Sequence, residues 1–256
     1  ALPPATLDRL RQRYGDRVFA FNHPSVHQTP PENIARLLGE LPNNMELDIV
    51  THSRGGLVGR ELIRQLADQP GRQVRVGKAV LVASPNRGTP LANGDHWIEM
   101  LDRYTNLIAQ APDTVATLIL EGVLTLVKII GHAALEALPG LHAMLPDGEY
   151  LRGLNASPPS TTRYHALVAD YQPNDPGWLN RFCKRVQDKL IDGLFEEAND
   201  GVVPTSGGYG VTRDGSGWQI PPEQRRAFAT ADGVSHSTFF AHPTVNEALL
   251  RWLTSD

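Results

Sequence analysis

"LDIVTHSRGGLVGREL", Leu47 to Leu62, is the part of this chain from which its fold is most readily predicted. An apolar run ends in Thr-His-Ser-Arg-Gly-Gly, and a pattern typical of an amphipathic helix follows directly. A serine at such a strand-to-helix junction lies in a strained turn that exposes its hydroxyl, and this geometry requires small neighbours. The stretch therefore predicts that Ser53 is a nucleophile. The alternative is an ordinary turn in which the serine caps the helix.

The turn departs from the usual nucleophile-elbow pattern at one position. That pattern is G-x-S-x-G, and Thr51 replaces its first glycine, whereas Gly55 supplies the second, with Gly56 behind it. Threonine is small enough to be tolerated there, but it adds crowding. The helix start places backbone N–H groups and a positive dipole end near a developing oxyanion. We therefore expect the backbone N–H of Arg54 to be one oxyanion-hole donor.

Strand and helix patterns alternate on both sides of the elbow, which indicates a mostly parallel sheet flanked by helices. Strands are expected at residues 17–21, 45–51, 78–84, 162–170 and 226–231. Helices are expected at residues 6–15, 30–41, 56–68, 177–195 and 243–253. The sequence therefore predicts an α/β fold.

The middle of the chain has little strand signal and much helix signal. Residues 113–138 form a long stretch with a helical pattern that is apolar on more than one face. We expect residues 91–158 to form a helical cap or lid inserted over the carboxyl edge of the sheet, or simply a packed helical subdomain. The α/β core then comprises residues 1–90 and 159–256.

Composition excludes several classes of protein. A net charge of −4 argues against a nucleic-acid partner, and the single cysteine, Cys183, allows neither an intrachain disulfide nor a cysteine cluster for zinc. We expect no metal and no cofactor. The longest apolar run, residues 115–130, is broken by Glu121 and Lys128, so no membrane span is expected. A cytoplasmic location fits; because the chain opens with Ala1, a secreted form with an upstream segment removed is the alternative.

A serine nucleophile needs an acid and a base, which follow it in this chain order in such folds. Asp200, in "NDGVVP", and Asp170, at a strand end, compete as the acid, and we favour Asp200 because its loop can present a carboxylate above the sheet. For the base we favour His236, a short loop after the last strand, over His242, which abuts the last helix. Ser53 would then attack an acyl carbonyl, with His236 as base and Asp200 orienting its ring.

Four segments together resemble the lipase-like α/β-hydrolases of bacteria: "VTHSRGGLVGREL", "LVASPNRGTPLAN", "NDGVVP" and "VSHSTFF". The resemblance covers residues 17–253 except the helical insertion. It implies an α/β-hydrolase fold, with Asp200 and His236 as the acid and the base. It also implies a small-molecule or lipid ester as substrate, with the insertion available for contact at a lipid interface.

One part of the family pattern is missing. The family places a central strand and a His-Gly motif before the first helix, where this chain has only "ALPPA". That strand would lie between residues 17–21 and 45–51, and its loop would donate the second oxyanion N–H. We therefore expect that the N-terminal strands are absent from this chain and that the natural polypeptide extends upstream, or that this is a processed or rearranged form.

Three functions remain open on the sequence. The first is a carboxylic-ester hydrolase, an esterase or lipase. The second is a catalytically weak or inactive module of the same fold that binds a partner, which the threonine at position 51 and the missing His-Gly loop favour. The third is a serine hydrolase acting on a thioester, amide or peptide bond, because this chemistry alone does not choose the leaving group.

Overall fold

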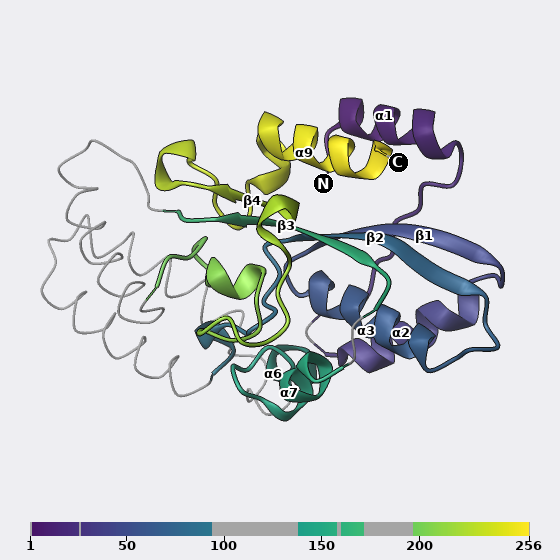
Figure 1. Cartoon of the computed structure of the whole chain (residues 1–256), viewed down its shortest axis with the longest axis horizontal. Helices are drawn as coiled ribbons and strands as arrows, with labels where there is room; N and C mark the ends of the chain where they lie inside the picture. Colours follow the sequence, from purple (N-terminus) through teal and green to yellow (C-terminus); the bar gives the residue numbers. More distant parts are fainter. Residues whose placement is uncertain (1, 26, 94–137, 158–159, 172–196, 256) are drawn as a thin grey trace, which may run out of the picture.

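A computed structural model describes residues 2–25, 27–93, 138–157, 160–171 and 197–255. Its four strands form one parallel sheet in the order β1-β2-β3-β4 (Figure 1). They are β1 (Met45–His52), β2 (Val74–Val82), β3 (Arg163–Ala169) and β4 (Arg225–Phe228). The predicted parallel sheet is confirmed, and the carboxyl ends of all four strands lie along one edge.

Helices cover both faces of the sheet (Figure 1). α1 (Pro4–Tyr14) and α9 (Pro243–Thr254) lie on one face, and α2 (Pro30–Glu40) and α3 (Gly55–Ala67) lie on the other. Two short helices, α6 (Pro139–His142) and α7 (Glu149–Asn155), lie on the side of α3. Short 3-10 turns are η1 (Pro90–Ala92), η3 (Ser206–Gly208), η4 (Pro222–Gln224), η5 (Thr230–Asp232) and η6 (Phe239–Ala241).

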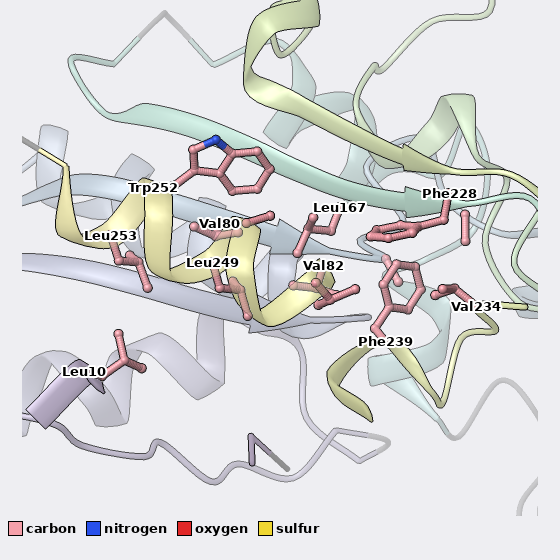
Figure 2. Packing of buried hydrophobic residues seen from close by; sticks show 14 residues of the cluster. Leu10, Val80, Val82, Leu167, Phe228, Val234, Phe239, Leu249, Trp252 and Leu253 are labelled. Atoms are coloured by element: carbon pink, nitrogen blue, oxygen red, sulfur yellow. The ribbon is translucent and has the colours of Figure 1, made fainter. Parts of the chain in front are cut away.

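The sheet separates two apolar cores. Between the sheet and the α1–α9 layer, Val80 and Leu167 pack against Leu249 and Phe239 (Figure 2). On the opposite face, Leu81 packs in a cluster with residues of α2 and α3. Alternate residues of β2 thus enter different cores, so its C-terminal half, Ala79 to Val82, is apolar and buried throughout, as expected for a parallel strand covered on both faces.

The prediction of a strand at residues 17–21 is wrong. These residues form no strand, and the side chain of Phe19 is 83% exposed and that of Phe21 is 38% exposed. Only Val18 packs against the core. A strand exists only where a neighbour accepts its backbone hydrogen bonds, and the outer edge of β1 has no partner strand among the described residues.

Other boundaries differ by smaller amounts. β2 begins at Val74 rather than at residue 78, and β4 ends at Phe228 rather than at residue 231. The expected helix at 177–195 and the apolar helix at 113–138 lie outside the described residues, apart from residue 138. α6 and α7 belong to the expected insertion at 91–158, whose separation from the core stays a prediction. None of the described helices is long and apolar enough to cross a membrane.

Candidate active site

Ser53 lies in the turn between β1 and α3, at the carboxyl edge of the sheet. Its φ angle is 55°, a left-handed conformation that costs a non-glycine residue free energy. The turn is held from both sides, because the Ser53 N–H donates to Val82 O over 2.9 Å and the Gly56 N–H donates to Ser53 O over 2.9 Å. This is the strained strand–serine–helix geometry that the sequence predicts.

Glycines on α3 make room for this turn. A Cβ on Gly56 would lie 1.9 Å from Ser84 Oγ, so the close approach of the turn after β2 requires glycine there. A Cβ on Gly59 would lie 3.0 Å from Thr51 Cγ2, whereas one on Gly55 would lie 3.8 Å from Thr51 Cβ. Threonine is therefore accommodated at position 51 because the helix presents glycines opposite it.

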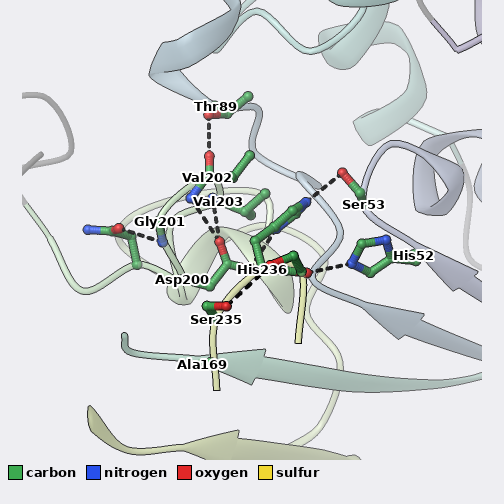
Figure 3. A network of polar contacts seen from close by, with 12 residues as sticks. His52, Ser53, Thr89, Ala169, Asp200, Gly201, Val202, Val203, Ser235 and His236 are labelled. Carbon is green, nitrogen blue, oxygen red and sulfur yellow. Dashed lines mark hydrogen bonds and ion pairs between the residues drawn. The ribbon is translucent and has the colours of Figure 1, made fainter. Parts of the chain in front are cut away.

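Three side chains from distant parts of the chain meet at this edge (Figure 3). Ser53 Oγ lies 2.9 Å from His236 Nε2, and His236 Nδ1 lies 2.9 Å from Asp200 Oδ2. Because the carboxylate can only accept, Nδ1 carries the proton and Nε2 is free to accept from the serine hydroxyl. The structure thus brings together all three side chains that the sequence singles out.

The carboxylate of Asp200 is buried, with a relative exposure of 2% for the residue. Its Oδ1 accepts the backbone N–H groups of Val202 and Val203, at 3.0 Å and 2.8 Å. Its backbone carbonyl accepts the N–H of His236 over 2.9 Å. These bonds compensate for the lost hydration of the carboxylate and fix the direction of Oδ2.

The competing side chains lie elsewhere. Asp170 accepts a hydrogen bond from Thr230 Oγ1 over 3.2 Å, and its N–H donates to Phe228 O. The ring of His242 packs edge-on against Phe228, directly before α9. Among the described residues, neither Asp170 nor His242 has a hydrogen bond to Ser53 or His236.

A family model described as a domain of unknown function (DUF7379) matches residues 1–254. The chain belongs to the DUF7379 family. No curated protein matches its sequence.

Solved structures similar to this DUF7379 chain include hydrolases. Phospholipase PlaB from Legionella pneumophila has a TM-score of 0.55 and 15% identity, over 99% of this chain and 56% of that one. A metagenomic carboxyl esterase has a TM-score of 0.48 and 17% identity, over 89% of this chain and 62% of that one. The chain thus spans less than two thirds of either protein. Together with the parallel sheet and its covering helices, the likeness to the phospholipase shows an α/β-hydrolase fold.

The side chain of Arg54 is a feature that sequence reasoning missed. The residue is only 5% exposed, and its guanidinium donates to Gly140 O over 2.9 Å, to Asn33 Oδ1 over 3.1 Å and to Gln28 O. Burial lowers the pKa of Arg54 to about 10. Arg54 therefore ties the elbow to α2 and α6, whereas the sequence draws attention only to its backbone N–H. No described residue accepts a hydrogen bond from that N–H.

The loop that carries Asp200 is anchored in this DUF7379 member by the turn after β2. Arg87 Nη2 donates to both carboxylate oxygens of Glu197, at 2.6 Å and 2.7 Å, and to Ser206 Oγ at 2.7 Å. Thr89 Oγ1 donates to Val202 O over 2.5 Å (Figure 3). In the sequence, this segment, Pro85 to Pro90, indicates only a family resemblance. Its contacts show that it positions the acid loop.

In the described ranges, no three histidine, cysteine, aspartate or glutamate side chains gather where they could hold a metal ion.

Proposed function

We propose that this chain is a serine hydrolase that cleaves carboxylic esters through an acyl-enzyme. The observation that carries the proposal is the hydrogen-bonded series Ser53–His236–Asp200, which begins at a serine held at positive φ. Nucleophile, base and orienting acid in this order are the arrangement that activates a serine hydroxyl.

In the proposed reaction, Ser53 Oγ attacks the ester carbonyl carbon while His236 Nε2 takes the hydroxyl proton. The tetrahedral intermediate then collapses, the ester bond breaks, and His236 returns the proton to the departing alkoxide oxygen. Water, deprotonated by the same nitrogen, attacks the acyl-serine; the bond to Ser53 Oγ breaks, His236 returns the proton to that oxygen, and the carboxylic acid is released. Asp200 Oδ2 keeps the ring in the productive tautomer and stabilises the imidazolium in both steps.

Two features of the elbow favour the negative charge that forms on the carbonyl oxygen. The Arg54 N–H lies at the start of α3 and donates to no described protein group, so it is available to the oxyanion. The helix dipole of the 13-residue α3 adds positive potential at the same point. One preorganised donor contributes about 10²–10³-fold in comparable enzymes.

The substrate class is proposed from chemistry and analogy. The similar structures include a phospholipase and a carboxyl esterase, which supports an ester of a small molecule or a lipid as substrate. Residues of the expected lid at 91–158 would supply interfacial contact. The reaction as proposed uses neither a cofactor nor a metal.

The test is hydrolysis of p-nitrophenyl esters of increasing acyl length, with an acyl p-nitroanilide and a thioester for comparison. We expect ester hydrolysis that Ser53→Ala abolishes, while circular dichroism shows an unchanged fold. Ser237→Ala, an exposed serine beside His236, is the matched control and should retain activity. Undiminished turnover in Ser53→Ala would refute the nucleophile, and faster cleavage of the anilide than of any ester would refute the bond specificity.

A further inference from the structure

His52 directly precedes the elbow serine, and its side chain reaches the loop that carries His236. Its Nε2 lies 2.8 Å from the backbone carbonyl oxygen of His236 (Figure 3). Since a carbonyl can only accept, Nε2 carries the proton and donates it.

The imidazole of His52 is also packed between aromatic rings. Its centroid lies 4.9 Å from that of His236 and 5.5 Å from that of Phe240. Burial lowers the pKa of His52, and the neighbouring His236 ring lowers it further. The hydrogen bond from His52 to the His236 backbone and the charge of Asp200 raise this pKa, but the net shift is downward. The ring therefore stays neutral, with its proton on Nε2, when the pH is near neutrality.

We propose that His52 is a positioning residue for the base: its Nε2–H holds the backbone of His236 so that the imidazole of His236 stays in reach of Ser53. The inference rests on the proposed function, because positioning matters only if His236 acts on the serine. His52 itself does not touch the reacting atoms.

The surroundings of His236 explain why such a hold is needed. His236 lies in the loop between η5 and η6, where no ladder or helical hydrogen bonds fix its backbone. Its N–H is held by the Asp200 carbonyl and its Nδ1 by the Asp200 carboxylate, both from one side. His52 holds the carbonyl from the side away from Asp200 (Figure 3), so His236 is fixed between β1 and the loop that carries Asp200.

The position of His52 in β1 fixes the geometry of its hydrogen bond to the His236 carbonyl. His52 pairs with Val82 in the ladder between β1 and β2, so its backbone is rigid. The next residue is Ser53, so a single short segment fixes both the nucleophile and the loop of the base. The 2.9 Å contact between Ser53 Oγ and His236 Nε2 depends on that arrangement, and misplacement by about 1 Å in an active site can cost about 10²-fold in rate.

The experiment compares His52→Leu with His52→Gln. Leucine keeps apolar packing against Phe240 but removes the donor, whereas the glutamine amide can still donate to the His236 carbonyl. We expect His52→Leu to lower kcat for an ester about 10- to 100-fold with KM changed less than about threefold, and His52→Gln to recover most of the loss. His242→Gln, a histidine that packs on Phe228 instead, is the matched control. If His52→Leu is unfolded, His52→Met repeats the comparison with a more flexible apolar side chain.

A second readout separates this inference from the proposed function. In ¹⁵N-histidine-labelled protein, the Nδ1 proton of His236, bonded to Asp200, should exchange with water faster in His52→Leu than in the wild type or in His52→Gln. This holds whether or not esters are cleaved, so a wild type without turnover but with this exchange pattern refutes only the function. Unchanged kcat and unchanged exchange in His52→Leu would overturn the positioning role, as would a glutamine variant no better than the leucine variant.

Discussion

At the scale of single residues, the two carboxylate oxygens of Asp200 make different contacts. Oδ1 is bound by two loop N–H groups, and Oδ2 faces the imidazole of His236. Asp200→Asn should keep the loop bonds but lose the charge and the correct tautomer of the base. We expect kcat to fall about 10³–10⁴-fold in steady-state ester hydrolysis, as in other triads. Asp170→Asn, which changes a side chain bonded to Thr230, should alter kcat less than about threefold; the reverse order would show that the wrong carboxylate had been chosen.

His165 determines a pH dependence of stability rather than of activity. The residue is 6% exposed and its ring stacks on Trp252 at 4.6 Å. Burial lowers its pKa to about 4, with smaller contributions from the nearby cations Arg163, Lys78 and Arg251. Between pH 4 and the unfolded pKa of about 6.5, the unfolded state binds a proton that the folded state does not. The free energy of unfolding must therefore fall as the pH is lowered through this window.

We expect this group to remove about 2 kcal/mol from the free energy of unfolding between pH 7.5 and pH 5, measured by urea titration. His165→Phe keeps a ring against Trp252 and cannot titrate, so its unfolding free energy should change by about 2 kcal/mol less over the same interval. Equal pH dependence in the two proteins would contradict this assignment.

Residue identities at the candidate site were predictable, but their side-chain contacts were not. Ser53, Asp200 and His236 each lie in a short local pattern of turn residues, and such a pattern can be recognised from the sequence. His52 contacts a carbonyl 184 residues away, and Arg54 contacts Gly140. Both contacts depend on how segments that are distant in the sequence pack against each other. No local pattern encodes that outcome.

At the scale of elements, β1 and α3 fit because β-branched side chains of the strand face a glycine of the helix. Gly59→Ala would improve helix propensity by about 1 kcal/mol, yet its Cβ would lie 3.0 Å from both Thr51 Cγ2 and Ile49 Cδ1. We expect a net loss of about 1–3 kcal/mol in urea unfolding, because overpacking a well-filled core costs that much.

A double-mutant cycle tests the cause. Thr51→Ser removes Cγ2 and should recover part of the loss in the Gly59→Ala background, with a coupling energy of about 0.5 kcal/mol or more. A Gly59→Ala protein more stable than the wild type would show that propensity outweighs packing here. Additive effects would show that Thr51 is not the neighbour that requires the glycine.

The expected strand at residues 17–21 shows where element prediction fails. Its composition, with Val18, Phe19 and Phe21, is typical of a strand, but composition does not supply a partner. The strands that are present each pair with at least one neighbour in the sheet. Phe19 remains exposed because the described chain places no strand against the outer edge of β1.

At the scale of the whole molecule, the alternation of strands and helices was sufficient to predict a parallel sheet covered on both faces. A parallel sheet brings all strand carboxyl ends to one edge, so Asp200 and His236, 147 and 183 residues after Ser53, can meet it there (Figure 3). The strand order and the division between core and insertion do not follow from alternation, because both depend on contacts between segments far apart in the chain.

Labelling of the folded chain with a fluorophosphonate tests directly the claim that Ser53 is an activated nucleophile. Mass spectrometry of the digested protein then locates the adduct. We expect one adduct on Ser53, formed at a rate that His236→Ala lowers by at least about 10³-fold. A folded wild-type protein that takes no adduct, or takes it on another residue, would contradict the claim.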